Sequence, residues 1–323
     1  MNYRRFLVKF VLALSAVLPF SAFAVYPDKP IRLVVPSAPG GAPDILMRVL
    51  ATRLSVQMGV PFIIDNKPGA SYVIGTMEIV RAAADGYTLG YGNVVSLATN
   101  RSLLDKVPYD IDRDLTLISN ALRVGNIQVV NNNVPVKNVE ELIAYAKKNP
   151  GKLSMASSGN GTTSHLGGEL FKSMTNTDML HVPYKAASAA INDLLSGQVQ
   201  VYMENSPVVG SYIKSGRVRA LGVCGLQRLG NYPDIPTVAE SGVPGFELMS
   251  WGGIIGPAGM PKEIVDRLNT EIRHALASPE VRERFKALDA EPTPGTPAEF
   301  RELSRRETEK WARVIKTSGA KVD

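Results

Sequence analysis

Two loops in this sequence have the composition of anion-binding turns, and the first lies near the start of the chain. It joins an apolar run, 31–35, to a segment whose apolar residues recur at helical spacing. Gly40 and Gly41 carry no side chain, so a ligand could approach their backbone N–H groups closely. These donors and the positive end of the helix dipole would attract a carboxylate or phosphate without any Arg or Lys. An ordinary strand-to-helix turn is the alternative. The candidate binding residues here are Ser37, Ala38, Pro39, Gly40, Gly41, Ala42 and Asp44.

The second loop follows a predicted strand and leads into a predicted helix at 164–175. Thr163 or Ser164 could cap that helix, which would leave the other hydroxyl and N–H groups facing outward. A dinucleotide fingerprint would need a third glycine after Gly159 and Gly161, and no P-loop lysine follows them, so a nucleotide site is not favoured. We expect an anion cradle that faces the first loop, with a capped surface turn as the alternative. The candidate residues are Ser157, Ser158, Gly159, Gly161, Thr162, Ser164 and His165.

Two further strand ends bring polar side chains to the same expected crevice, because ligands of open α/β sheets bind at the carboxyl ends of strands. Tyr184 could close over a small ligand, or it could pack in the core. Glu204 and Asn205 end the next predicted strand. The Glu204 carboxylate could pair with a ligand ammonium or with Lys185, and we expect the pair with Lys185.

The sequence gives little support for a catalytic or a metal-binding site. Several serines lie near His165, but none has the G-x-S-x-G surroundings of a nucleophile elbow, so a secreted hydrolase is only a minor alternative. Three histidines and a single cysteine, Cys224, do not suggest a metal site, and we expect no cofactor. Cys224 lies in an apolar strand and is expected to be a small buried residue.

The first 24 residues have the pattern of a secretory signal peptide. Basic residues precede an apolar run, 10–20, and small residues end it at Ala24. We therefore expect cleavage after Ala24 and a periplasmic protein. The formal net charge of +6 includes three charges of this leader, and what remains is too small to indicate a nucleic-acid partner.

The order of predicted elements indicates an α/β protein with two lobes. Strands and helices alternate before residue 122, and again between 123 and 248, which predicts a parallel sheet flanked by helices in each lobe. The helices after 249 have no strands of their own and are expected to cover the first lobe. Lobe 1 would then comprise 25–122 and 249–323, and lobe 2 would comprise 123–248. Two crossings, near 119–123 and 247–252, would form a hinge beside a cleft.

Six motifs spread through the chain resemble the Bug family, the periplasmic solute receptors of tripartite tricarboxylate transporters, of which TctC is an example. They are Tyr26-Pro27-x-Lys29-Pro30-Ile31-Arg32, Ala38-Pro39-Gly40-Gly41-x-x-Asp44, Asn66-Lys67-Pro68-Gly69-Ala70, Asp85-Gly86-Tyr87-Thr88-Leu89, His181-Val182-Pro183-Tyr184-Lys185 and Pro233-Asp234-Ile235-Pro236-Thr237.

The resemblance implies a periplasmic-binding-protein (Venus flytrap) fold that clamps a small carboxylate between its lobes and delivers it to membrane permease subunits. It implies that backbone amides and ordered waters at the first loop hold the carboxylate, while lobe 2 adds its Gly/Ser/Thr loop. We expect a monomer. Ser37 stands where the family commonly has an aromatic residue, Ala186 replaces a frequent Gly, and Glu204 replaces a usual Asp. A periplasmic sensor or co-receptor for a signalling system is the alternative.

Overall fold

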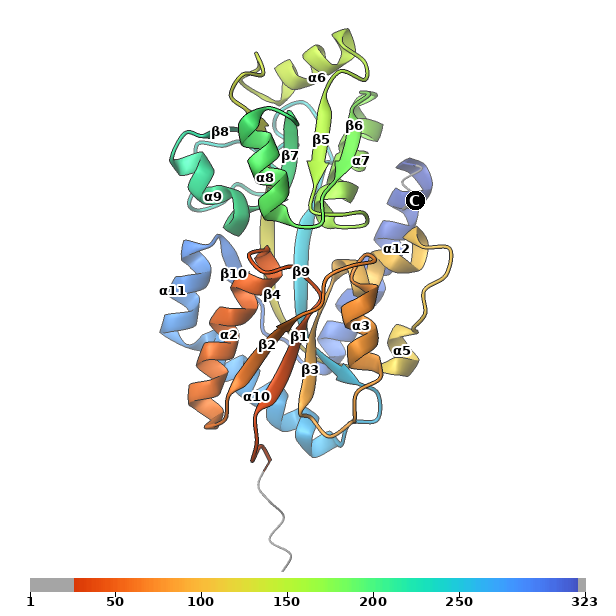
Figure 1. Ribbon diagram of the computed structural model, residues 1–323, viewed down its shortest axis with the longest axis vertical. Coiled ribbons are helices and arrows are strands. Elements are labelled where there is room, and N and C mark those ends of the chain that lie inside the picture. The colour runs from red at the N-terminus through yellow and green to blue at the C-terminus, as the bar shows by residue number, and fades with distance from the viewer. Residues whose placement is uncertain (1–25, 319–323) are drawn as a thin grey trace, which may run out of the picture.

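One long strand, β4 (Leu115–Asn131), runs through both lobes of the molecule and organises its sheet. The computed structural model describes residues 26–318, and the two lobes are stacked along its long axis (Figure 1). The strand order is β2 (Phe62–Asn66), β1 (Ile31–Val35), β3 (Thr88–Asn93), β9 (Met249–Pro257), β4, β7 (Val201–Asn205), β5 (Ser154–Ser157) and β6 (Leu180–Pro183). Two further strands, β8 (Val218–Val223) and β10 (Ala290–Pro292), also pair with β4. The predicted signal peptide, 1–24, lies outside the described residues. The predicted two-lobed α/β class is confirmed by the solved structures compared below.

Lobe 1 is the lower lobe in Figure 1 and contains the first loop predicted to bind anions. Its sheet strands are β1 (Ile31–Val35), β2 (Phe62–Asn66), β3 (Thr88–Asn93), β9 (Met249–Pro257) and β10 (Ala290–Pro292), with the first half of β4. Its helices are α2 (Ala42–Met58), α3 (Val73–Val80), η1 (Val95–Thr99), α4 (Asn100–Leu103), α5 (Ile111–Asp114), α10 (Lys262–Ala277) and α11 (Pro279–Ala287).

Lobe 2 repeats the pattern on a smaller sheet. Its strands are the second half of β4, β5 (Ser154–Ser157), β6 (Leu180–Pro183), β7 (Val201–Asn205) and β8 (Val218–Val223). Its helices are α6 (Val139–Lys148), α7 (Thr163–Thr175), α8 (Ala187–Ser196) and α9 (Ser206–Lys214). Gly197 and Gly216 adopt the left-handed conformation just past α8 and α9, as their positions after those helices predict.

The sheet is mixed, whereas the alternation of strands and helices predicts parallel sheets. β1, β2 and β3 are parallel, and so are β5, β6 and β7, but β4 is antiparallel to β7, β8 and β9. The cause is the crossing itself. β4 leaves lobe 1 at the carboxyl ends of the β1–β3 strands and enters lobe 2 at the carboxyl ends of β5–β7. It must therefore run against the lobe 2 strands, and both sets of carboxyl ends face one cleft.

The partner of β4 changes within the hinge. Gly125 still pairs with Met249 of β9, and Asn126 already pairs with Asn205 of β7. The change lies two residues beyond the stretch predicted to cross, 119–123, and the domain boundaries themselves stay a prediction.

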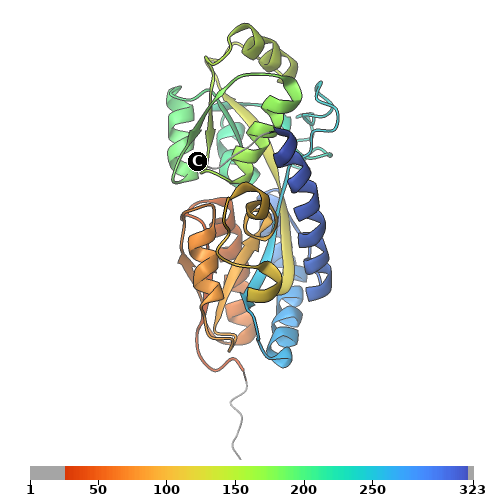
Figure 2. The ribbon, with the colours of Figure 1, turned by 90° about the vertical axis from the view of Figure 1, so that its right-hand side faces the viewer.

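The last helix, α12 (Pro297–Ser318), does more than cover lobe 1. It packs on η1 and β4 and also reaches α7 of lobe 2, so it lies along the side of both lobes (Figure 2). The indole N–H groups of Trp251 and Trp311 both donate to Glu307, each at 3.2 Å. Lys310 pairs with Glu247 at 2.7 Å, beside the second crossing. The tail thus braces the hinge.

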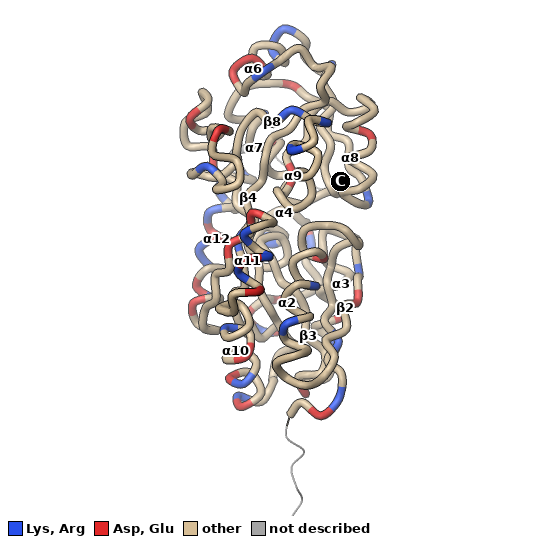
Figure 3. The backbone as a smooth tube through the Cα atoms, turned by 90° about the vertical axis from the view of Figure 1, so that its left-hand side faces the viewer, with Lys and Arg blue, Asp and Glu red and all other residues tan. Residues whose placement is uncertain are grey.

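The buried apolar side chains form three groups: one in lobe 1, one in lobe 2, and a third that extends through both lobes and includes Phe300 and Trp311 of α12. The α2 side chains Leu46, Leu50 and Leu54 are buried, as the helical spacing of apolar residues predicts. Cys224 is also buried and burial raises the pKa of its thiol. Over residues 26–318, no helix has the length and apolar character needed to span a bilayer. Basic and acidic residues are interspersed over the outer surface (Figure 3).

Candidate functional site

A cavity of ≈ 570 Å³ lies between the lobes, where the loops after β1 and β2 face the loops after β5, β6 and β7. The lobe 1 wall consists of Pro36, Ser37, Ala38, Gly41, Ala42, Pro43, Pro68, Gly69, Ala70, Ser71 and Tyr72. The lobe 2 wall consists of Ser158, Gly159, Asn160, Thr162, Thr163, Pro183, Tyr184, Lys185, Ala186, Ala187, Glu204 and Asn205.

The lobe 1 wall presents the N-terminus of α2. Gly41 precedes the helix and has no side chain that could cap it. Pro43, in the first turn, has no N–H. The first N–H groups of any helix lack an intrahelical acceptor. Among the described residues, none accepts a hydrogen bond from the amides of Ala42 or Asp44. Ala42 lines the cavity, so this helix end brings an unpaired donor and a positive dipole end to it.

The glycine amides are engaged elsewhere, so the prediction that they are free donors is wrong. Gly40 N–H donates to Asp44 Oδ2 at 2.9 Å, and Gly41 N–H donates to Ala38 O at 3.2 Å. Asp44 is buried and also accepts from Arg48 and Asn66, at 2.9 and 3.0 Å. Burial would raise the pKa of Asp44, but these hydrogen bonds outweigh burial and lower it. Asp44 therefore holds the loop by hydrogen bonds and does not itself line the cavity.

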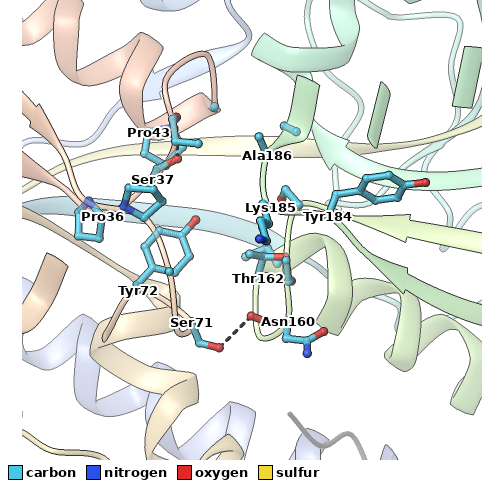
Figure 4. A pocket seen from close by; sticks show the side chains of 18 of the residues that line it. Pro36, Ser37, Pro43, Ser71, Tyr72, Asn160, Thr162, Tyr184, Lys185 and Ala186 are labelled. Carbon is cyan, nitrogen blue, oxygen red and sulfur yellow. Dashed lines mark hydrogen bonds between the residues drawn. The ribbon is translucent and has the colours of Figure 1, made fainter. Parts of the chain in front are cut away.

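A strained turn forms the second part of the lobe 1 wall. Gly69, Ala70, Ser71 and Tyr72 have φ values of 124°, 45°, 51° and 70°, which is a costly conformation for three non-glycine residues. Asn100 Nδ2 holds the turn by donating to Ser71 O at 2.8 Å. The Ser71 hydroxyl donates across the cleft to Asn160 O at 2.9 Å (Figure 4). This hydrogen bond joins the two walls.

Gly69 and Ala70 belong to one of the six motifs, but no residue of this turn is among the residues predicted to bind the ligand. The available signal was its position, because it follows β2 at the same sheet edge as the first loop. The cavity residues that are not among the individually named candidates are Pro36, Pro43, Pro68, Gly69, Ala70, Ser71, Tyr72, Asn160, Thr163, Pro183, Lys185, Ala186 and Ala187.

Hydroxyl groups dominate the loop after β5. The cap of α7 is Thr162, whose Oγ1 accepts from His165 N–H at 3.5 Å, and not Thr163 or Ser164 as predicted. Ser164 Oγ lies 3.0 Å from Ser158 Oγ and 2.9 Å from Thr162 Oγ1. Ser164 therefore orients the two hydroxyl groups that line the cavity and does not line it itself.

Two histidines support this loop from behind. Ser157 Oγ lies 2.7 Å from His181 Nε2, and Gly161 N–H donates to His165 Nδ1 at 3.1 Å. The two imidazole rings are stacked with their centroids 4.1 Å apart. Burial lowers the pKa of His181 to about 4, so its imidazole is neutral near pH 7. Since Ser157 is fully buried and does not line the cavity, its contact with His181 does not form an accessible nucleophile.

Candidate metal-ligand atoms of His165, Glu169 and His181 lie within 4.8 Å of one another. Each of the three residues has another contact in this structure. His165 Nδ1 accepts from a backbone amide, His181 contacts Ser157, and Glu169 pairs with Lys172 at 2.8 Å. The ammonium of Lys172 would also repel a cation. The group fits loop support better than a metal centre.

Glu204 is the carboxyl group of the lobe 2 wall and lies at the end of β7. Its side chain is buried, and it forms no ion pair with Lys185 or with any other described residue, so the predicted pair with Lys185 is wrong. Lys185 is exposed at the edge of the cavity. Tyr184 turns its hydroxyl away from the cavity and donates to Asp193 at 2.7 Å (Figure 4). Asn205 Nδ2 donates to Asn126 and Ser250, which anchors it at the hinge.

The structure brings ten of the predicted residues to one cavity: Ser37, Ala38, Gly41, Ala42, Ser158, Gly159, Thr162, Tyr184, Glu204 and Asn205. The others predicted to bind do not line it: Pro39, Gly40, Asp44, Ser157, Gly161, Ser164 and His165. Their polar groups bond within the loops that shape the walls. Direct contact with a ligand stays a prediction for all of them.

Comparisons with known proteins place this geometry in a family. The profile of the tripartite tricarboxylate transporter family receptor, TctC, matches residues 46–320. The chain is 37% identical to the protein BugT of Bordetella pertussis, over 97% of this chain and 96% of BugT.

Solved structures agree with that match. The R. palustris protein Rpa4515, solved with adipate, has a TM-score of 0.89 and 37% identity, covering 91% of this chain and 98% of its own. MatC from Rhodopseudomonas palustris, solved with bound malate, has a TM-score of 0.85 and 27% identity, covering 90% and 100%. The chain belongs to the tripartite tricarboxylate transporter receptor (TctC) family.

Proposed function

We propose that this protein is a periplasmic receptor that binds a small carboxylate in the cavity between its lobes and delivers it to the membrane permease of a tripartite transporter. The observation that carries the proposal is the α2 N-terminus, which has unpaired amides and lines a cavity of ≈ 570 Å³. A helix N-terminus favours negative charge, and this volume suits a small organic ligand. The adipate and malate bound by two relatives support the carboxylate class.

Closure would follow from contacts on both walls. A ligand that bridges the α2 amides and the lobe 2 loops contacts more of the protein when the lobes are together, and only such differential contact shifts the balance towards the closed form. The Ser71–Asn160 hydrogen bond forms in the same arrangement.

Receptors of this family are periplasmic, and the leader ending at Ala24 supports the same location for this chain. We infer that the mature protein acts as a monomer and without catalysis. The serine nearest an imidazole, Ser157, is buried behind the lobe 2 wall, which supports binding without turnover.

The test is calorimetric titration with paired probes: succinate and adipate against the neutral diamides succinamide and adipamide. We expect a carboxylate to bind and its diamide not to bind. Ala42→Pro removes one N–H from the first helical position, where proline is tolerated. We expect this variant to lose about tenfold to 100-fold in carboxylate affinity, the worth of one hydrogen bond to a charged group, with little change in melting temperature.

Lys262→Pro is the matched control. It places proline at the first position of α10, which follows Pro261 and lies outside the cavity. We expect it to bind carboxylates like the parent protein. Equal affinity for carboxylates and diamides, or an unchanged affinity in Ala42→Pro, would contradict the proposed role of the α2 amides.

A further inference from the structure

Glu204 differs from every other group on the cavity walls because it is a buried carboxyl group with no cation beside it. Its side chain is 3% exposed. Glu204 Oε2 accepts from the Tyr202 hydroxyl at 2.6 Å, and Oε1 accepts from Asn205 N–H at 2.7 Å. The nearby Ser158 side chain also favours the charged form of this carboxyl group. These neighbours are all neutral, and within residues 26–318 no Lys, Arg or His forms an ion pair with this carboxyl group.

The donors around Glu204 indicate how it is held. Burial raises the pKa of Glu204, and the hydrogen bonds from Tyr202 and Asn205, together with the Ser158 side chain, act in the opposite direction. A carboxylate has about four acceptor positions, and the hydrogen bonds from Tyr202 and Asn205 use two of them. An acceptor position is therefore left for a donor in the cavity that the residue lines. Burying a charge without a partner costs free energy. A hydrogen-bond donor or a cation on the ligand would supply the partner that the protein itself does not provide.

We propose that Glu204 receives a hydrogen-bond donor of the ligand, so that the protein selects small carboxylates that also carry an ammonium or a hydroxyl group. This inference rests on the proposed function. The ligand carboxylate lies at the α2 amides on the lobe 1 wall, and its donor group meets Glu204 on the lobe 2 wall. A second carboxylate placed at Glu204 would be repelled by it, whereas an ammonium would supply the missing counter-charge.

The experiment compares matched ligands by calorimetry at pH 7.5. One series is succinate, malate and aspartate, and the other is adipate, 2-hydroxyadipate and 2-aminoadipate. In at least one series we expect the hydroxyl or ammonium compound to bind more than fivefold more tightly than the unsubstituted acid, in keeping with one hydrogen bond to a charged group. The order within the series shows whether the donor is a hydroxyl or an ammonium.

Glu204→Gln keeps the shape and removes the charge, and we expect it to reduce that preference to less than twofold. Glu140→Gln, an exposed residue of α6 in the same lobe, is the charge-matched control and should keep the parent preference. Glu204→Asp withdraws the carboxyl group by one methylene and should lower the preference as well. It serves in place of Glu204→Gln if that variant does not fold.

The outcomes separate the two proposals. If carboxylates bind but no donor-bearing compound is preferred fivefold, or if both Glu204 variants keep the parent preference, the role of Glu204 is overturned while the receptor function stands. If no carboxylate in either series binds, the receptor function itself fails.

Discussion

The two walls of the cavity are built from different chemical groups. The lobe 1 wall presents backbone amides at the start of α2 and small residues of two tight loops, and it has no charged side chain. The lobe 2 wall presents the hydroxyl groups of Ser158, Thr162 and Thr163 together with the Glu204 carboxyl group and the Lys185 ammonium.

This difference suggests that the two lobes have different roles in ligand recognition. Backbone amides at a helix end recognise negative charge whatever the rest of the ligand is, because their direction is fixed by the helix. Side chains on the opposite wall can change in type without changing the fold, so they can determine which carboxylate is preferred. On this interpretation lobe 1 supplies affinity for the class and lobe 2 supplies discrimination within it.

The largest effect is expected from a side chain placed on the lobe 1 wall. Gly41→Val should reduce carboxylate affinity by more than about 100-fold, since it disturbs more than one hydrogen bond to a charged group. A Cβ at Gly41 would lie 2.7 Å from Ser37 Oγ and 3.3 Å from Ala38 O, so the Ser37 side chain and the backbone at Ala38 must shift. Calorimetric titration with succinate and adipate measures the loss.

Gly40→Ala is the comparison for this first prediction. Gly40 does not line the cavity, and a Cβ there would meet nothing within 4 Å, although its φ of +79° makes any side chain strained. We expect lower stability in this variant and a much smaller loss of affinity. Equal losses in both variants would indicate that general loop strain, and not the wall at Gly41, controls binding.

The next effect tests whether the walls must meet. Gly161→Ala should lower affinity by about tenfold, because a Cβ at Gly161 would lie 2.8 Å from Ser71 Oγ and 3.0 Å from Leu103 Cδ2 in the other lobe. The inserted methyl group separates the lobes on this side of the cleft. Small-angle scattering with saturating ligand should then show a larger radius of gyration than for the parent protein.

Gly216→Ala separates this wedge from backbone strain. Gly216 has a φ of +68°, close to the +76° of Gly161, and lies in the same lobe, but a Cβ there would meet nothing within 4 Å. Both variants pay a similar conformational cost. Only Gly161→Ala should lose affinity and remain open; a matching loss in Gly216→Ala would mean that lobe contact is not required.

The sequence predicted the lobes and the loop positions better than the hydrogen bonds inside them. The strand-to-helix loops after β1 and β5 could be found because glycine, hydroxyl and small residues follow apolar runs. That Gly40 N–H turns to Asp44, and not to the cavity, depends on a loop conformation that local composition does not specify. The antiparallel direction of β4 could not be predicted either, because its partners β7 and β9 lie far away in the chain.

The lobe 2 wall shows the same limit. Glu204 was identified from its place at a strand end, but its expected partner Lys185 was inferred from sequence proximity alone. In the structure the loop after β6 leaves Lys185 exposed at the cavity edge, while β7 buries Glu204 beside Tyr202. Which of these two side chains is buried depends on tertiary packing, so their proximity in the sequence could not predict an ion pair.

The smallest expected effect is a change of preference with pH, and it concerns the lobe 2 wall alone. Burial raises the pKa of Glu204 above its usual value, so acidification protonates it earlier than an exposed glutamate. The preference for an ammonium-bearing ligand over its unsubstituted partner should therefore fall as the pH is lowered from 7.5 to 5. Tyr202 and Tyr72, which face Glu204, have raised pKa values and stay neutral, and His181 titrates only near 4.

Stability of the ligand-free protein should change in the opposite direction. A carboxyl group whose pKa is raised by folding stabilises the native state at low pH, and that contribution is lost as pH rises through the raised value. The melting temperature of the parent protein, measured relative to Glu204→Gln at each pH, should thus rise as pH falls, while the ammonium preference declines. If the relative melting temperature and the ammonium preference both fell as the pH was lowered, the charge on Glu204 would stabilise the fold of lobe 2 and would not determine ligand preference.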